Sequence, residues 1–328
     1  MVKQLRVFCG SSVDPYLNLA LEKHLMDQVM PGECILYLWQ NKNTVVIGRN
    51  QNAWVECRTG LLEEEGGRLA RRLSGGGAVF HDLGNLNFTF LIGEEDYDVD
   101  RQLSVIQKAC AFAGIQAEKS GRNDVLAEGR KFSGNAFYHS EGKAYHHGTL
   151  LVDTDMEKLG RYLSPSKAKL EAKGVSSVRS RVVNLKELSP GLSCEKMKEY
   201  MVKAFCEVYG AACSEIVLKD EDWAAVEALA AKYGSWEYLY GAPLPFTFQC
   251  EERFSWGSVE IQLDAKSGII ISAKVYSDAM DWSLPEQLEK ALIGCRFTKE
   301  AMMGAISGTI ADGDVCDDLC GIIKKQDI

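Results

Sequence analysis

Residues 71–85 read RRLSGGGAVFHDLGN, and this stretch carries most of the information in the chain. Two arginines precede three consecutive glycines, and an apolar segment follows them directly. Because glycine has no Cβ, the backbone N–H groups of such a loop can approach an anion closely. The guanidinium groups of Arg71 and Arg72 supply positive charge for a phosphate or carboxylate. A surface hairpin turn is the alternative, but the paired arginines and the HDLGN sequence after the glycines favour an anion-binding loop.

The length and composition are those of a globular protein with a sizeable core. The chain has 328 residues, of which 46% are hydrophobic, and this length predicts one large and one small domain. The formal net charge of −9 argues against a general nucleic-acid-binding protein, because such proteins normally carry a basic face.

The eleven cysteines are scattered along the chain, and the first eight residues contain no apolar core of the length of a signal peptide. No apolar run approaches the length of a membrane span. We therefore expect reduced thiols, a cytoplasmic location and no membrane association. Cys316 and Cys320 would share a helix face and could bind a metal. No second pair lies nearby, so two ordinary thiols are the favoured interpretation.

Helix caps and apolar patterns predict a mixed α and β region up to about residue 245. Asp14 is an N-cap acceptor before a proline at the first helical position, and Leu17, Leu21 and Leu25 give the following helix one apolar face. Further helices are predicted at 61–65, 101–113 and 193–209, and strands at 35–39, 44–48, 68–70, 87–92 and 145–152. Helices packed beside a sheet account for this order.

The pattern of predicted elements changes near residue 245, where two prolines, Pro243 and Pro245, interrupt the chain. Two predicted strands, 258–263 and 269–276, flank a turn, and three helical stretches follow, the first opened by Ser283. We therefore predict one large domain over residues 1–245 and a small α+β domain over residues 246–328.

Two further segments carry polar groups that one site could share. In residues 120–125, Asn123 and Asp124 lie in a turn, where Asp124 would suit a nucleotide-bound Mg²⁺; an Asx-turn is the alternative. In residues 129–136, Lys131 lies between small residues that let a ligand approach; a solvated surface charge is the alternative. An ammonium group there would neutralise a carboxylate and an α-phosphate together.

Residues 146–151 form a predicted strand that contains two adjacent histidines, His146 and His147. Adjacent residues of a strand point to opposite faces, so this pair cannot readily ligate one metal. We therefore expect at most one of the two histidines to face a site.

Taken in order, these segments resemble the lipoate–protein ligase family. The matching motifs occupy residues 71–85, 121–124, 129–131, 146–151 and 172–185, and residues 44–52 and 253–260 also fit. One departure is the short stretch 126–128, where some relatives are longer. The resemblance implies an α+β fold: a biotin/lipoate protein ligase-like catalytic domain of mixed sheets flanked by helices, and a small α+β C-terminal accessory domain.

The family joins lipoate to ATP, which gives lipoyl-AMP and pyrophosphate, and then passes the lipoyl group to a lysine ε-amine. The resemblance implies that Lys131 is catalytic, because it would contact both the lipoyl carbonyl and the α-phosphate. The other residues of the matched motifs that it assigns to ATP or lipoate are Arg72, Ser74, Gly75, Gly76, Gly77, Ala78, Val79, Phe80, His81, Asn85, Asn123, Asp124, His147, Gly148 and Arg181.

The resemblance also implies the ligands and partners of the protein. ATP and lipoate are the expected substrates, with Mg²⁺ entering on the nucleotide and Asp124 as its candidate ligand. The expected acceptors are lipoyl domains of 2-oxoacid dehydrogenase E2 subunits and the glycine-cleavage H protein. We expect a cytoplasmic monomer with no nucleic-acid partner.

Three alternatives remain open at this point. An acyltransferase of the same fold would move octanoyl or lipoyl groups through a cysteine thioester, which needs an activated thiol near the lysine and histidine segments. No cysteine occurs between Cys110 and Cys194, which weighs against it. The others are a transferase that uses preformed lipoyl-AMP and a non-catalytic binder of lipoylated partners. The attached C-terminal domain fits a two-step ligase, and the full set of polar loops disfavours the binder.

A basic segment spans residues 166–181. Its charged residues are Lys167, Lys169, Lys173, Arg179 and Arg181, against the single acid Glu171. A solvated charge run is the simple interpretation. The resemblance implies instead an adenylate-binding loop that folds over lipoyl-AMP and keeps water from the mixed anhydride.

We predict that lipoate together with ATP protects the basic segment from proteolysis, because the adenylate formed in the site would order it. Limited proteolysis with a trypsin-like protease, followed by mass spectrometry of the fragments, measures this. Lipoate alone and ATP alone are the controls. Cleavage at an unchanged rate with both substrates present would contradict the prediction.

Overall fold

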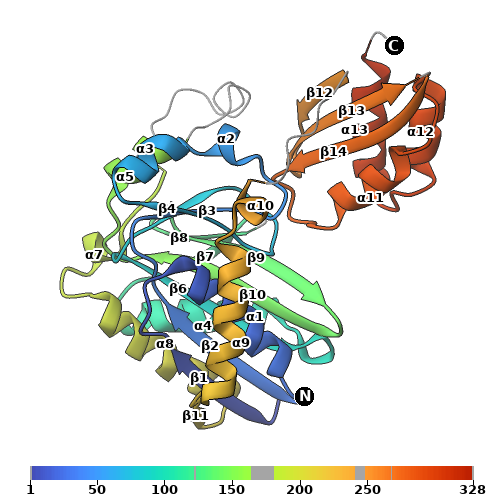
Figure 1. The fold of residues 1–328 in the computed structure, drawn as a ribbon. Helices are drawn as coiled ribbons and strands as arrows, with labels where there is room; N and C mark the ends of the chain where they lie inside the picture. Colours follow the sequence, from blue (N-terminus) through green and yellow to red (C-terminus); the bar gives the residue numbers. More distant parts are fainter. Residues whose placement is uncertain (1, 122, 164–180, 241–247, 267, 327–328) are drawn as a thin grey trace.

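The structure is a computed structural model, and it describes residues 2–121, 123–163, 181–240, 248–266 and 268–326. Figure 1 shows two bodies. The described residues up to 240 form the large body, and those from 248 onward form the smaller one. The predicted domain boundary between residues 245 and 246 lies outside the described residues, so its position stays a prediction.

An eight-stranded mixed sheet forms the centre of the large body. Its strands, in spatial order, are β11 (Cys213–Glu215), β1 (Gln4–Cys9), β2 (Glu33–Trp39), β6 (Asn85–Gly93), β10 (Lys143–Leu151), β9 (Arg130–Ser140), β8 (Asp124–Ala127) and β7 (Glu118–Ser120). Strands β11, β1 and β2 run parallel, and all other neighbours are antiparallel. Every residue of β2 is buried, as expected for a central strand covered on both faces.

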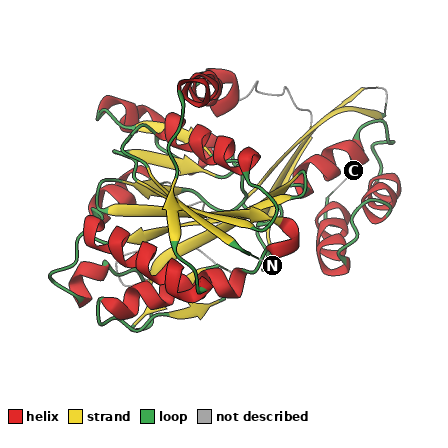
Figure 2. Ribbon diagram, turned by 90° about the horizontal axis from the view of Figure 1, so that it is seen from below, coloured by secondary structure: helices red, strands yellow, loops and turns green. Residues whose placement is uncertain are grey.

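Helices cover both faces of this sheet, as Figure 2 shows. The helices of one face are α4 (Val99–Phe112) and α8 (Cys194–Tyr209), and those of the other face are α1 (Pro15–Gln28) and α9 (Asp220–Tyr233). Phe88 of β6 packs in the first core and Tyr37 of β2 in the second. The predicted helix start is confirmed, because the Asp14 carboxylate accepts from the N–H groups of Tyr16 and Leu17.

A second, three-stranded sheet lies over the α1 face. Its strands are, in order, β4 (Arg68–Arg71), β3 (Thr44–Ile47) and β5 (Val79–His81). Val46 and Ala70 point toward the core beneath α1, whereas Val45 and Leu69 point into an outer apolar cluster that contains Tyr162. The remaining elements of the large body are α2 (Ala53–Glu56), α3 (Thr59–Glu64), η1 (Glu94–Asp96), α5 (Met156–Tyr162), α7 (Leu185–Leu188) and α10 (Trp236–Leu239).

The smaller body is a three-stranded antiparallel sheet with helices on one face. Its elements are β12 (Phe248–Arg253), β13 (Ser258–Lys266), β14 (Ile269–Ser277), α11 (Leu284–Leu292), α12 (Lys299–Ser307) and α13 (Gly313–Lys324). Val259, Ile261 and Leu263 alternate inward from β13 and meet Leu288 and Ile306 of the helices. The predicted α+β class, with a small α+β unit at the C-terminus, is thereby confirmed.

The structure adds two facts about the strands that the sequence patterns did not predict. The predicted strands 35–39 and 44–48 both form, as β2 and β3, but they lie in different sheets. Residues 130–140, first considered only as a polar segment around Lys131, form the long strand β9. Its polar and small residues face the pocket described below and hide the alternation that marks a strand.

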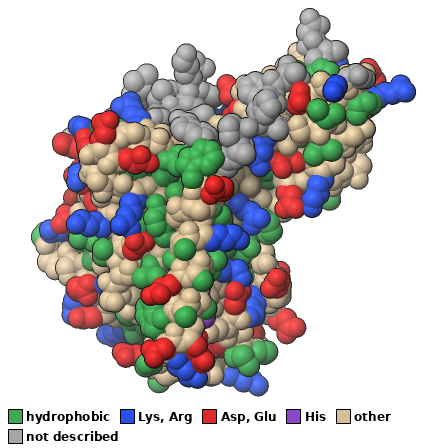
Figure 3. Space-filling model, viewed as in Figure 1, with side chains coloured by type: hydrophobic (Ala, Val, Ile, Leu, Met, Phe, Trp, Pro, Cys, Tyr) green, Lys and Arg blue, Asp and Glu red, His purple; other side chains and the backbone are tan. Residues whose placement is uncertain are grey.

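The surface of the large body carries charges of both signs, interspersed on the face that Figure 3 shows. Within the described residues, no helix combines the length and the apolar character that crossing a bilayer requires.

The turn between β5 and β6 generates a stability prediction. A Cβ on Gly84 would lie 2.0 Å from the carbonyl oxygen of Asp153, and the Gly84 carbonyl accepts from the N–H groups of Val152 and Asp153. Gly84→Ala should therefore push the two segments apart and lower the free energy of unfolding by about 1–3 kcal/mol.

Urea denaturation followed by circular dichroism measures this change. Gly93→Ala is the matched control, because nothing lies within 4 Å of a Cβ at that position, and it should change stability by no more than about 0.5 kcal/mol. Equal effects of the two substitutions would contradict the packing argument.

Candidate active site

A pocket that encloses about 150 Å³ is lined by residues of both sheets of the large body. Trp39, Asn87 and Thr149 contribute side chains from β2, β6 and β10, and Val79 and His81 contribute from β5. The small sheet therefore acts as the roof and the large sheet as the floor. Apolar and polar groups share the lining, which suits a ligand with an apolar chain and a charged end.

The glycine loop, residues 72–78, joins β4 to β5 and forms one wall of the pocket. Arg72 is only 6% exposed, and its guanidinium donates to the carbonyl oxygens of Gly75 and Gly77 at 2.7 and 2.8 Å. Burial lowers the pKa of Arg72 to about 10, which leaves it charged at neutral pH. The buried arginine thus holds the loop in shape.

Arg71 also binds backbone carbonyls, on the other side of β4. Its Nη1 donates to the carbonyl oxygens of Arg49 and Gln51 at 2.9 and 2.7 Å, and its Nε donates to that of Leu239 at 3.1 Å. The two arginines of the motif therefore organise the chain around the loop, and direct binding of an anion by them stays a prediction.

A chain of hydrogen bonds leads from Arg72 into the core beneath the pocket. Arg72 Nε donates to Ser74 Oγ at 3.1 Å, and Ser74 Oγ lies 2.8 Å from His147 Nε2. His147 Nδ1 lies 2.8 Å from Glu22 Oε1. Thr89 Oγ1 donates to the same Glu22 oxygen at 2.7 Å. Glu22 and Ser74 are 2% and 0% exposed, so the chain is shielded from water.

One arrangement of protons satisfies every link of this chain. A guanidinium N–H can only donate, so Ser74 Oγ accepts from Arg72; in this arrangement its own hydroxyl proton points to His147 Nε2. His147 then carries its ring proton on Nδ1 and donates to the Glu22 carboxylate. The chain begins on the Arg72 guanidinium and ends on the Glu22 carboxylate, and each link between them is a hydrogen bond.

Ser74, His147 and Glu22 are ordered like a nucleophilic triad, but Ser74 cannot act as a nucleophile here. Its side chain is fully buried and does not line the pocket, so a substrate carbonyl has no path to its Oγ. The three residues instead connect the glycine loop to α1 and β10.

Lys131 reaches the pocket from β9, near the edge of the large sheet. Its Nζ lies 2.7 Å from Asp124 Oδ1, and the two side chains are 36% and 38% exposed. A Cβ on Gly134 would come within 3.0 Å of this Nζ, so glycine leaves room for the ammonium group. Lys131 is therefore held by one carboxylate and remains open to a ligand.

The turn that carries Asn123 is fixed to β9 by reciprocal bonds with Asn135. The Asn135 N–H donates to the Asn123 carbonyl at 2.8 Å, and Asn123 Nδ2 donates to the Asn135 carbonyl at 3.0 Å. Both residues line the pocket beside Lys131. The polar end of the pocket is thus built from paired backbone and amide groups on rigid strands.

The smaller body contacts the glycine loop directly. The Gly76 N–H donates to the carbonyl oxygen of Ala279 at 3.1 Å, and a Cβ on Gly75 would lie 2.3 Å from the same oxygen. The guanidinium of Arg49 lies 4.5 Å from the centre of the Trp282 ring, within cation–π distance. Gly75 must therefore be glycine because another backbone passes close to it.

Most of the site residues predicted from the sequence line this pocket. They are Arg72, Gly76, Gly77, Ala78, Val79, His81, Asn123, Lys131, His147 and Gly148. The structure therefore brings together the four segments that the sequence singled out.

Five of the other predicted residues lie next to the pocket without lining it. Ser74 and Asn85 are fully buried behind its wall, Gly75 faces Ala279, and Asp124 pairs with Lys131. Arg181 is exposed, and its carbonyl accepts from the Lys131 N–H at 2.9 Å. The rest of the basic segment, residues 166–180, lies outside the described residues.

The expected position of Phe80 is corrected by the structure. Along β5 the side chains alternate between the two faces, so Val79 and His81 face the pocket and Phe80 does not. Phe80 is 1% exposed and packs in the outer cluster, with its ring centre 5.4 Å from that of Tyr162.

Several residues of the site were missed at the level of sequence. Leu19, Trp39, Asn87 and Thr149 line the pocket, and Glu22 ends the buried chain. A usable signal existed for both polar residues: Asn87 shares one face of its strand with Asn85 and Thr89, and Glu22 lies on an otherwise apolar helix face. Nothing in the sequence indicated which partner each would meet.

His146 and His147 face opposite sides of β10, as expected. His147 lines the pocket, whereas His146 packs against Phe88 and its Nε2 lies 2.8 Å from Asn135 Oδ1. Burial lowers the pKa of His146 to about 3, so this ring is neutral in the folded protein.

Two family models match the chain, one for each part of the structure. Residues 14–206 match the family described as lipoyl protein ligase A/B catalytic domain, and residues 244–314 match the bacterial lipoate protein ligase C-terminus. The chain belongs to the lipoyl protein ligase A/B catalytic domain family, which confirms the resemblance found in the sequence.

Solved structures show the same architecture. The chain is similar to LipL1 of P. falciparum, crystallised in complex with lipoate, at 26% identity and a TM-score of 0.86, over 98% of this chain and 100% of that one. It is also similar to a bi-partite lipoate protein ligase of Thermoplasma acidophilum, at 25% identity, a TM-score of 0.66 and coverage of 76% and 100%. A lipoate-protein ligase A bound with ATP shares the fold at 24% identity, a TM-score of 0.64 and coverage of 74% and 99%.

The buried histidine on β10 generates a prediction for pH. Because the folded-state pKa of His146 lies below the unfolded value near 6.5, the unfolded chain binds the extra proton between about pH 6.5 and 3. The free energy of unfolding therefore falls as the pH falls through this window, by about 1.4 kcal/mol per pH unit for one such histidine.

His146→Gln should make the slope of stability against pH shallower by about this amount between pH 6 and 4. Urea denaturation at a series of pH values measures it. His139→Gln, at a side chain that is 41% exposed, is the control and should keep the wild-type slope. A wild-type slope in the His146 variant would contradict the prediction.

Proposed function

We propose that this protein activates lipoate with ATP and transfers the lipoyl group to a lysine of lipoyl-domain acceptor proteins. The observation that carries the proposal is Lys131 at the open, polar end of a pocket whose other lining is largely apolar. A carboxylic acid with an apolar tail fits such a pocket with its carboxylate at Lys131. Membership of the lipoate ligase family supports the same choice of acid.

In the first step a carboxylate oxygen of lipoate attacks the α-phosphorus of ATP, and pyrophosphate leaves. Two anions have to approach each other, so the site must supply positive charge where negative charge develops. The Lys131 ammonium meets this need, because it can exchange its contact with Asp124 for the carboxylate and the α-phosphate. The paired amides of Asn123 and Asn135 and the glycine loop form the polar walls around it.

In the second step the acceptor lysine amine attacks the carbonyl carbon of lipoyl-AMP, and AMP leaves. The amide forms only if water does not reach the mixed anhydride first. The roof formed by the small sheet and the glycine loop encloses the apolar part of the pocket. The basic segment is the candidate cover for the adenylate, and the described residues on either side of it are held in the fold: Leu163, which follows α5, pairs with Cys57, and Val182 pairs with Lys131.

Mg²⁺ would enter this site with the nucleotide. Among the described residues, no three His, Cys, Asp or Glu side chains come together as a metal site. Mg²⁺ in nucleotide enzymes commonly binds one or two carboxylates, substrate phosphates and water. Asp124 therefore fits as its one protein carboxylate, and the ion would supply further positive charge to the phosphates.

The thioester transferase is disfavoured by the positions of the thiols. All eleven cysteines lie in the described part of the chain as free thiols, and none of them lines the pocket. Burial raises the pKa of Cys57 and Cys110 to about 12, which suppresses the thiolate. A transferase that uses preformed lipoyl-AMP remains the second candidate, because the same pocket would hold that adenylate.

The acceptor is proposed by analogy with the family. The structure from Thermoplasma acidophilum describes an archaeal lipoylation system with an E2 lipoyl domain. We extend this to acceptors of the same kind here, and a monomeric, cytoplasmic protein remains our expectation.

Exchange of labelled pyrophosphate into ATP, dependent on lipoate, tests the proposal. A ligase catalyses this exchange, whereas a thioester transferase, a preformed-adenylate transferase and a binder do not. Lys131→Ala should lower the exchange rate at least 100-fold, because the ammonium stabilises charge in the transition state.

Lys143→Ala is the matched control, since Lys143 lies at the start of β10 and contacts the carbonyl of Asp27 instead of the pocket. It should exchange at the wild-type rate. Exchange that persists in the Lys131 variant would remove the catalytic assignment, and absence of exchange in the wild type would remove the ligase.

A further inference from the structure

Two N–H donors face the pocket without a partner. They are Nε2 of His81 and Nδ2 of Asn87, and among the described residues no group accepts from either. His81 is 3% exposed and Asn87 is 1% exposed, and both residues line the pocket. A buried donor without an acceptor costs free energy, so a pair of them in one pocket requires an explanation.

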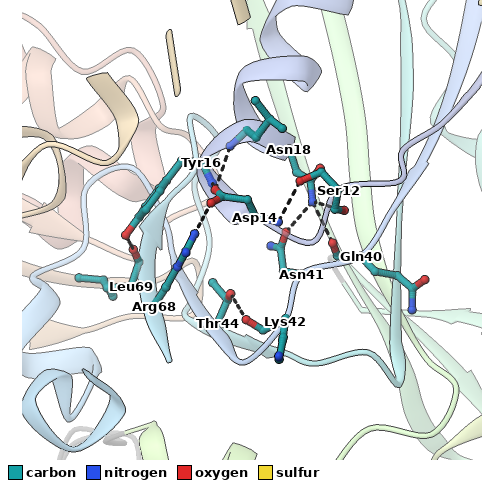
Figure 4. A network of polar contacts seen from close by, with 11 residues as sticks. Ser12, Asp14, Tyr16, Asn18, Gln40, Asn41, Lys42, Thr44, Arg68 and Leu69 are labelled. Atoms are coloured by element: carbon teal, nitrogen blue, oxygen red, sulfur yellow. Dashed lines mark hydrogen bonds and ion pairs between the residues drawn. The ribbon is translucent and has the colours of Figure 1, made fainter. Parts of the chain in front are cut away.

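The proton of His81 is fixed by a chain of amides that Figure 4 shows in part. Asn18 Nδ2 donates to the Gln40 carbonyl at 2.8 Å and to Asn41 Oδ1 at 3.0 Å. Because the Asn41 oxygen accepts, its amide nitrogen faces Nδ1 of His81, at 3.2 Å. Nδ1 is therefore the acceptor and Nε2 carries the proton.

The ring of His81 stays neutral in the folded protein. Burial, with the positive charge of Arg72 nearby, lowers its pKa to about 3. Nε2–H is thus a permanent donor of fixed direction at neutral pH. The unpartnered Nε2 of His81 is therefore a donor, so only a ligand atom that accepts a hydrogen bond can pair with it.

Asn87 presents its donor in a similar way. Its Oδ1 accepts from Asn85 Nδ2 at 2.9 Å, and Asn85 Oδ1 on the other side of this pair has no partner among the described residues. The Nδ2 of Asn87 remains for the pocket. In this orientation of the amide, a ligand atom that meets Asn87 accepts a hydrogen bond.

The register of the large sheet places these donors at the end of the pocket remote from Lys131. Asn87 of β6 lies opposite Trp39 of β2 and Thr149 of β10. The Gly134 N–H of β9 donates to Thr149 Oγ1 at 3.3 Å, and Lys131 packs against Gly134. Gly134 and Asn87 are thus two strand spacings apart, roughly 10 Å.

Trp39 closes this remote end. Its ring centre lies 6.1 Å from that of His81, with the rings nearly perpendicular. The end is therefore an apolar wall beside two aligned N–H donors. A purely hydrocarbon tail would fill it and leave both donors unpaired, whereas a tail that ends in atoms with lone pairs would satisfy them.

We propose that His81 and Asn87 are specificity-determining residues that recognise the two ring sulfurs of the lipoate dithiolane. Disulfide sulfur is a weak acceptor, and it combines this with the apolar contact surface that Trp39 requires. This inference rests on the proposed function and adds to it: the site selects lipoate over straight-chain fatty acids such as octanoate through these two N–H groups.

Binding by the wild-type protein provides the first test, because it needs no variant. Isothermal titration calorimetry compares lipoate with 5-cyclopentylpentanoate, which has nearly the same shape but no sulfur, and with octanoate. We expect lipoate to bind at least tenfold more tightly than either. Equal affinity for lipoate and the carbocyclic acid would overturn the inference, and so would the absence of binding by all three.

Variants provide the second test. His81→Phe and Asn87→Leu remove one donor each at similar volume, and each should reduce the ratio of lipoate to octanoate kcat/KM in pyrophosphate exchange about fivefold or more. His139→Phe is the control for the ring substitution and should leave the ratio unchanged. Ratios that stay at the wild-type value in both variants would overturn the inference.

The two proposals fail in different ways. If the wild type binds lipoate selectively but shows no pyrophosphate exchange, the ligase assignment fails and the recognition by His81 and Asn87 stands. If exchange proceeds equally well with lipoate and octanoate, the recognition fails and the ligase assignment stands.

Discussion

Among the residues that the structure describes, no carboxylate pairs directly with the buried guanidinium of Arg72, so its acceptors are mainly backbone carbonyls, and the glycine loop is shaped by this requirement. Arg72 binds the carbonyls of Gly75 and Gly77, and its charge is balanced by Glu22 through Ser74 and His147. Removing a partner of such a buried pair leaves an uncompensated charge. The roof of the pocket, the orientation of His147 and the position of α1 therefore depend on one connected set of polar groups.

This arrangement gives the pocket two ends of different character. Strands β8 and β9, near one edge of the sheet, carry Asp124 and Lys131, which remain partly open to solvent. The central strands β2 and β6 carry Trp39 and Asn87, which line the pocket and are closed off from solvent. Chemistry that needs access by a nucleotide and an acceptor protein suits the edge of the sheet, and recognition of a tail suits its centre. Because both sets stand on strands of one sheet, their separation is fixed.

Much of the fold was predictable because local patterns sufficed. Asp14 before proline marked α1, and alternation marked β13. Strand 44–48 was also found, but its membership of a second sheet was not, since sheet order depends on tertiary contacts. The glycine motif and Lys131 indicated the site by residue type. Phe80 was misplaced because the phase of a three-residue strand cannot be read from sequence, and Glu22 was missed because its partners lie far along the chain.

Through the contact between Gly76 and Ala279, the C-terminal unit competes with any anion that would bind the same N–H of the glycine loop. In this structure the Gly76 N–H already has an acceptor, supplied by the C-terminal unit. Any anion that uses the same N–H must first displace that carbonyl. Its apparent affinity is therefore the intrinsic affinity multiplied by the fraction of molecules in which the loop is uncovered. By reciprocity, an anion bound there weakens the hold of the C-terminal unit by the same factor. The two parts of the chain are thus linked thermodynamically through a single amide.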